Sequence, residues 1–127
     1  MCHHGHMQLR VVRRTDRFDE ASRFWGELMG CSVTREWPAD EVQGRGRIFG
    51  VHDGVGVELI EVPTAEPVEG VFLALEVDDV DALHRHLADH GITILQPPTD
   101  QPWGHRNIAV LDPSGIRVGC FHWLTEH

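Results

Sequence analysis

The sequence lacks long apolar runs and is poor in basic residues and in cysteine. No apolar run approaches the roughly 18 to 20 residues that a membrane-spanning helix needs, so we expect no membrane association. Eleven basic residues stand against 20 acidic ones, and the resulting net charge of −9 argues against nucleic acid as a partner. The same charge mildly favours a cationic or neutral partner, although solubility alone explains it.

The three cysteines (Cys2, Cys31 and Cys120) are odd in number and show no CxxC spacing. This pattern is typical of free thiols in a reducing compartment, and the amino terminus has no hydrophobic signal core, so we expect a cytoplasmic location. Residues 1–6 (MCHHGH) hold one cysteine and three histidines but no scaffold that would fix metal geometry. We interpret them as a polar tail or a cloning remnant.

The second half of the chain predicts one strand, one helix and three further strands. Residues 71–77 alternate in the period-two manner of a strand. Asp78 and Asp79 offer capping oxygens for a helix with an apolar side, and Gly91 ends that helix because glycine accepts a left-handed conformation.

Three short apolar runs follow, at residues 92–95, 106–111 and 116–121. We expect Pro97-Pro98 to separate the first two strands and the turn at residues 112–115 to separate the last two.

The first half repeats this order less clearly. Residues 7–12 alternate as a strand, and Asp16 or Asp19 is expected to cap a helix that Gly30 closes. A strand at residues 31–37 precedes a polar loop. Two further strands, at residues 48–51 and 55–62, form a hairpin around Asp53-Gly54, a strong turn signal.

The repeat predicts an α+β domain made of two βαβββ modules, residues 7–62 and 71–124, joined by a linker at residues 63–70. Neither copy can bury its sheet alone. Paired copies would curve into an eight-stranded half-open barrel, with the helices outside and a cavity on the concave face.

Several segments carry a resemblance to a known family. They are ALEVDDVDAL, the Trp-Gly before the following strand and LDPSGIRV in the second module, and RFWGELMG in the first. The chain resembles the vicinal oxygen chelate superfamily, which includes glyoxalase I, the extradiol dioxygenases and the bleomycin-resistance proteins. The resemblance covers nearly all of residues 7–124 and implies the fold more strongly than any one activity.

The resemblance also implies where a metal would bind. Enzymes of this family place one ligand on the first strand and one on the last strand of each module. The matching positions here are Arg10 or Leu9, Glu58, Phe72 and Gly119, of which only Glu58 can donate to a metal. A catalytic divalent ion needs about three protein ligands. We therefore expect no metal, no cofactor and no catalytic residue, as in the metal-free, ligand-binding branch of the family.

Other reactive groups give little support to an enzyme. The sequence has no G-x-S-x-G elbow, P-loop, dinucleotide fingerprint or H-E-x-x-H motif. Cys120 and His122 share one face of a strand, but that face is opposite Gly119 and is expected to turn away from the cavity. His86 and His90, one helical turn apart, are expected on the outer surface.

The candidate ligand-binding residues are those expected to face the cavity or its mouth: Trp103, Phe72, Glu58, Glu76, Arg10, Arg106, His105 and Phe49. Phe72 and Trp103 would stack on an aromatic ring, and Glu58 and Glu76 would pair with a cation. Three of these assignments have simpler alternatives. Phe49 can instead be a core residue. Arg106 can instead be a solvated strand end beside an acidic neighbour, and Trp103 can instead cover its own core.

The leading hypothesis is a small-molecule binding protein of the glyoxalase/bleomycin-resistance type. It would sequester an aromatic or cationic ligand in its cavity without a metal, and the resemblance implies a homodimer. The alternative is a metal-dependent lyase, isomerase or dioxygenase of the same superfamily, using Glu58 with ligands not identified from the sequence. A third reading is a protein-interaction module whose cavity has closed.

Overall fold

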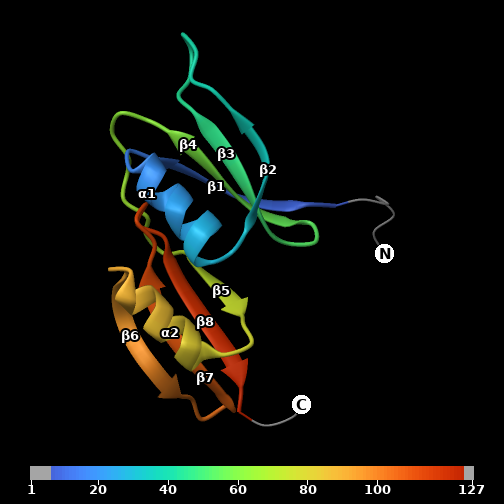
Figure 1. Cartoon of the computed structure of the whole chain (residues 1–127), viewed down its shortest axis with the longest axis vertical. Coiled ribbons are helices and arrows are strands. Elements are labelled where there is room, and N and C mark those ends of the chain that lie inside the picture. Colours follow the sequence, from blue (N-terminus) through green and yellow to red (C-terminus); the bar gives the residue numbers. More distant parts are fainter. Residues whose placement is uncertain (1–6, 125–127) are drawn as a thin grey trace. The chain divides into compact units, whose positions relative to one another are not determined.

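The computed structural model describes residues 7–124, and the chain divides into two compact units after Glu66. This boundary lies within residues 63–70. Each unit is a strand, a helix and three further strands, so the predicted α+β fold of two βαβββ modules is confirmed (Figure 1). The closure of the two sheets into one half-open barrel stays a prediction. Among the described residues, no helix is long and apolar enough to cross a membrane.

The first module forms a four-stranded sheet in the order β1-β4-β3-β2. Its β1 is parallel to β4, and the other neighbours are antiparallel. Its elements are β1 (Leu9–Thr15), α1 (Phe18–Arg23), a π-helical turn η1 (Phe24–Leu28), β2 (Ser32–Trp37), β3 (Gly46–His52) and β4 (Val55–Glu61).

The second module repeats this topology in the order β5-β8-β7-β6, with β5 parallel to β8. Its elements are β5 (Phe72–Glu76), α2 (Val80–Asp89), β6 (Thr93–Asp100), β7 (His105–Leu111) and β8 (Arg117–Trp123).

Helix α2 begins and ends where the sequence predicts. The Asp79 carboxylate accepts a hydrogen bond from the Ala82 backbone N–H at 3.0 Å, and this bond holds the pKa of Asp79 below its ordinary value. Gly91 has φ of 77°, the left-handed conformation expected after the helix. Val80 and Leu87 are fully buried.

The predicted cap of the first helix is wrong. The N-cap residue of α1 is Arg17, and no side chain caps it. Instead, the Thr15 hydroxyl accepts a hydrogen bond from the Arg17 N–H at 2.9 Å, which turns the chain from β1 into the helix. Asp19 lies in the first helical turn and has a different partner.

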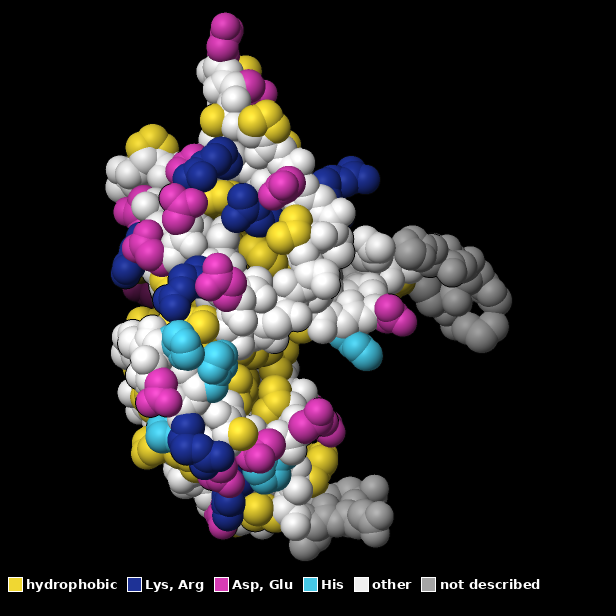
Figure 2. Space-filling view, in the orientation of Figure 1, with side chains coloured by type: hydrophobic (Ala, Val, Ile, Leu, Met, Phe, Trp, Pro, Cys, Tyr) yellow, Lys and Arg dark blue, Asp and Glu magenta, His cyan; other side chains and the backbone are white. Residues whose placement is uncertain are grey.

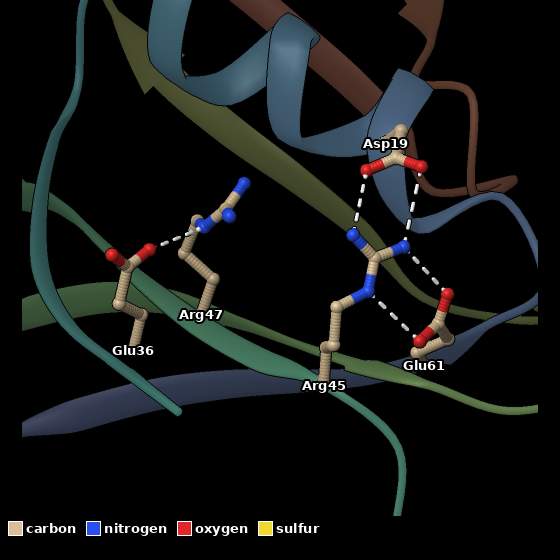
Figure 3. Close-up of polar contacts among 5 residues, drawn as sticks. All are labelled: Asp19, Glu36, Arg45, Arg47 and Glu61. Carbon is tan, nitrogen blue, oxygen red and sulfur yellow. Dashed lines mark hydrogen bonds and ion pairs between the residues drawn. The ribbon is translucent and has the colours of Figure 1, made fainter. Parts of the chain in front are cut away.

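That partner is Arg45, which ties α1 to the end of β4 (Figure 3). Its guanidinium donates to Glu61 at 2.9 and 2.7 Å and to Asp19 at 3.1 and 3.2 Å. The same group lies 4.7 Å from the centre of the buried Phe18 ring. The bonds from Arg45 hold the pKa of Glu61 below its ordinary value. Figure 3 also shows the ion pair of Arg47 with Glu36.

The strand boundaries agree with the sequence except at Pro97-Pro98. These prolines were expected to end a strand, but β6 continues through them to Asp100. The reason is that β6 is an edge strand, paired with β7 alone, and its register shifts between Gln96 and Thr99. A proline without an N–H is tolerated at such a position.

Each sheet has one face covered by its own helix and one face that this helix leaves uncovered, which we call the open face. The strand residues buried on the helix-covered face of the second module are Ile108, Val110, Val118 and Cys120; those of the first are Phe49, Val57 and Leu59. On the helix side of the first module, acidic and basic side chains are interspersed (Figure 2).

Candidate functional site

The open face of the second module carries a group of aromatic side chains. The register pairs His105 with Trp123 and Asn107 with Phe121, and it places Phe72 on the same face at the start of β5. Phe72 is 62% exposed and Trp123 41%. A contiguous patch of exposed aromatic side chains, unlike a single one, is typical of a binding surface.

His105 lies at the centre of this group. Its ring is 4.6 Å from Phe121, 5.2 Å from Trp123 and 5.4 Å from Trp103, measured between ring centres. These separations are typical of favourable aromatic pairs. We call Trp103, His105, Phe121 and Trp123 together the aromatic face. Phe72 is on the same side of the sheet, but it lies beside Arg117 at the other end of β8.

Trp103 belongs to the loop between β6 and β7 and is 60% exposed. Its indole N–H donates a hydrogen bond to Nε2 of His105. Because an indole can only donate, Nε2 must accept, and the neutral imidazole then carries its proton on Nδ1. That Nδ1 atom is buried and has no hydrogen-bond partner among the described residues. The aromatic face therefore holds one N–H donor with unused capacity.

Two of the predicted residues share the open side of the sheet with the histidine. Phe72 and Glu76 both project from β5 on the open side, and Glu76 lies opposite Phe121 in the parallel register. The Glu76 side chain is exposed. An exposed carboxylate beside aromatic rings can attract a cationic group on an aromatic ligand.

Sequence reasoning missed Phe121 and Trp123 as members of the face. The signal was present, because they lie two and four residues after Gly119 and so share its side of the strand.

Arg106 is not part of this site. It lies on the helix-covered face, where its guanidinium donates to Asp81 of α2 at 2.8 Å and to Asp100 of β6 at 2.6 Å. The bond from Arg106 holds the pKa of Asp100 below its ordinary value. This placement favours the alternative, a strand end paired with acidic neighbours, and ligand binding by Arg106 stays a prediction.

In the first module, Arg10 and Glu58 share the open face as expected, but they bind each other. Arg10 Nη1 lies 3.0 Å from Glu58 Oε1, and the Glu58 side chain is only 14% exposed. Phe49 lies on the other face, opposite Val57, and is 1% exposed. It packs near Gly26, so Phe49 is a core residue and does not line a wall with Glu58.

The residues at the family's metal positions do not fit a metal. Glu58 is bound by the permanent cation of Arg10, and a guanidinium cannot donate a lone pair. The corresponding positions of the second module hold Phe72 and Gly119, which offer no donor atom. Among residues 7–124, no group of three or more His, Cys, Asp and Glu side chains is arranged to hold an ion.

The Cys120–His122 pair lies on the helix-covered face, away from the aromatic face, as the sequence predicts. Burial raises the pKa of the Cys120 thiol to about 12, so the thiolate that a nucleophile requires is scarce near neutral pH. The Nδ1 atom of His122 accepts a hydrogen bond from the Val80 N–H at 2.8 Å, which helps to cap α2. His86 and His90 pack against each other on the outside of the same helix.

Comparison with protein families matches residues 7–119 to the glyoxalase/bleomycin resistance protein/dioxygenase superfamily. Among solved structures, TnmS3, an antibiotic binding protein from Streptomyces sp. CB03234, is 27% identical and has a TM-score of 0.73. The match covers 93% of this chain and 95% of that one. TioX from Micromonospora sp. ML1 is 21% identical over 94% of this chain and 100% of that chain, with a TM-score of 0.72.

A V278E mutant of glyoxalase I from Zea mays has a TM-score of 0.79 at 19% identity. The match covers 91% of this chain but 44% of that enzyme. The likeness to TioX and to this enzyme shows the fold alone. A search of curated proteins found no match. The family match spans most of the sequence, and the two βαβββ modules agree with it. The chain belongs to the glyoxalase/bleomycin resistance protein/dioxygenase superfamily.

Proposed function

We propose that the protein binds an aromatic small molecule on the aromatic face of its second module and acts by sequestering it without a metal. The observation that carries this proposal is the group of three aromatic rings and one imidazole on the open face. Flat apolar rings with a few polar groups are the usual lining of sites for organic ligands.

The polar groups beside the rings indicate which aromatic ligands fit. The exposed Glu76 carboxylate favours a ring system that bears a cationic group. The Nδ1–H of His105 can donate to a carbonyl or phenolic oxygen once a ligand opens the packing around it. The similarity to TnmS3, described as an antibiotic binding protein, supports an antibiotic-like compound as the ligand.

The metal-dependent alternative has less support. It needs about three donor side chains, and the positions where this family keeps them hold an arginine–glutamate pair, a phenylalanine and a glycine. A tightly held ion in chelator-washed protein, from which residues 1–6 have been removed, would favour the enzyme over the binding protein.

Tryptophan fluorescence tests the proposal. The parent protein is titrated with a panel of cationic and neutral polycyclic aromatics. We expect the compounds that bind to change the emission, and Trp103→Ala to weaken their binding about 10- to 30-fold, as loss of a central aromatic contact does. Trp37→Phe is the matched control, because Trp37 lies in the first module, and it should leave affinity unchanged. Equal binding by Trp103→Ala and the parent would overturn the assignment.

Two further parts of the proposal concern assembly and location. We propose a homodimer, which sedimentation equilibrium tests. We also propose a cytoplasmic location, which is supported by Cys31 and Cys120 being free thiols in the described part of the chain.

A further inference from the structure

The open face of the first module has a hollow of about 320 Å³ that the proposed function does not use. Its polar lining comes from Gln8, Arg10, Thr34, Arg35 and His52. None of the described residues that line it is acidic. In a chain with a net charge of −9, a hollow with two guanidinium groups and no carboxylate in its lining is unusual.

Bare backbone forms part of the hollow's floor. Gly50 of β3 and Gly56 of β4 are direct cross-strand partners, and neither has a positive φ, so the backbone conformation does not require glycine. A Cβ at Gly56 would lie 3.0 Å from the Phe49 carbonyl oxygen and 3.6 Å from Cγ of Arg10. A Cβ at Gly50 would lie 3.1 Å from the Thr34 methyl group. Glycine at these two positions therefore lets the Thr34 side chain and the Arg10 stem lie close against the sheet.

Register shifts occur on both sides of Gly50. The β2–β3 ladder shifts between Val33 and Arg35, and the β3–β4 ladder shifts between Gly50 and His52. Such bulges bend a strand and redirect its side chains. Thr34, Arg35 and His52, which lie at these two shifts, all line the hollow.

The two arginines differ in how they are held. Glu58 fixes Arg10 through one of its nitrogens at 3.0 Å, which leaves other N–H groups of the same guanidinium available. Arg35 is exposed and forms no ion pair with the described residues. One guanidinium is thus positioned in advance, and the second is free to close on a ligand.

From this arrangement we infer that the hollow binds an anionic group, a carboxylate or a phosphate, carried by a small molecule. Guanidinium groups match both anions in charge and in the geometry of their donors. Gly50 and Gly56, which also line the hollow, add no side chain that would fill it.

Two-dimensional NMR of the full chain tests this inference with three probes: inorganic phosphate, 2-naphthoate and, as the cationic counterpart, 2-naphthylmethylamine. We expect phosphate or naphthoate to shift the backbone amides of Gly50, Gly54 and Gly56 at millimolar concentration. Arg35→Gln should weaken that binding about tenfold, the usual effect of losing a hydrogen bond to a charged group. Comparing the affinities for phosphate and for naphthoate, measured from these amide shifts, identifies which anion the hollow prefers.

Arg23→Gln is the matched control, since it removes the same charge from α1 of the same module and should leave the affinity unchanged. Equal weakening by both variants, or absence of amide shifts with both anions, would overturn the inference. So would shifts at these glycines by naphthylmethylamine that match those by naphthoate. Phosphate carries no ring, so its failure to bind leaves the proposal for the second module standing.

Discussion

The indole N–H of Trp103 donates a hydrogen bond to Nε2 of His105, two residues further along the chain. This bond explains how an exposed loop tryptophan is held beside the His105 ring, which in turn contacts Phe121 and Trp123 of β8. It also fixes the imidazole tautomer and leaves the Nδ1 proton without a partner in the described structure. The face thus combines ring surface with one directed N–H donor.

Replacing His105 by phenylalanine separates these two contributions. The variant keeps a ring between Phe121 and Trp123 but removes both the acceptor for Trp103 and the Nδ1 donor. We expect affinity for oxygen-bearing aromatics to fall about fivefold, the effect of one lost hydrogen bond, while aromatics without oxygen lose less. Fluorescence titration of matched compound pairs measures the difference. An equal loss for both kinds of compound would contradict the role given to Nδ1.

Removing the exposed carboxylate tests the charge preference. Glu76→Gln keeps the size of the side chain, and we expect cationic aromatics to bind more weakly while neutral aromatics are unaffected. The effect should diminish as salt is added, because the carboxylate is exposed. Competition titrations at low and high salt check both expectations, and Glu66→Gln, in the exposed segment between the modules, is the charge-matched control.

Acid should weaken the link between α1 and β4. Arg45 lowers the pKa of Glu61 in the folded protein, so this carboxylate contributes stability above its ordinary pKa of about 4.5. That contribution is lost as the pH falls through the lower pKa that Glu61 has in the folded protein. Denaturant unfolding between pH 7 and pH 3 should therefore show a smaller acid loss for Glu61→Gln than for the parent. An identical pH dependence in both proteins would contradict the assignment.

The start of α2 depends on the Asp79 cap. Asp79→Ala removes the acceptor for the Ala82 N–H and should lower the melting temperature. Asp79→Asn keeps an acceptor and should lower the melting temperature less. Thermal denaturation followed by circular dichroism checks this order. If the two variants melt at one temperature, the cap does not carry the effect.

A glutamate can be placed at the family's final-strand position. A Cβ at Gly119 would come no closer than 3.6 Å to its neighbours, with the Leu73 carbonyl oxygen nearest, so Gly119→Glu should fold. It should not gain a tightly held metal, because Arg10 and Phe72 remain at two of the other positions. Metal analysis after chelator washing, on chains without residues 1–6, checks this expectation. A stoichiometric ion in the variant would show that a nearly complete donor set had been overlooked.

The parts of the fold that sequence predicts are those with local causes. Asp79 and Gly91 mark the ends of α2 because capping and a left-handed glycine act within one helical turn. Alternation likewise places Phe72 and Glu76 on one side of β5. In contrast, the chain enters α1 through a hydrogen bond to the Thr15 hydroxyl. This residue does not fit the aspartate cap that the sequence predicts for the helix.

The sequence is least informative where strand register determines the side of the sheet on which a residue lies. Phe49 joins the core because it lies opposite Val57. This pairing depends on a register shift of the β3–β4 ladder between Gly50 and His52, which no sequence motif predicts. Arg106 lies on the side of Ile108 and Val110, so alternation along β7 was a signal that its guanidinium faces the helix. The continuation of β6 through Pro97-Pro98 follows from its place at the sheet edge, which is a tertiary property.

The most direct test of the account is a crystal structure of the protein with the tightest-binding aromatic compound of the panel. We predict that the ring system of the compound contacts Trp103, Phe121 and Trp123, with an oxygen within hydrogen-bonding distance of His105 Nδ1. A compound bound away from these side chains, or an ordered metal ion held by three or more side chains, would contradict the account.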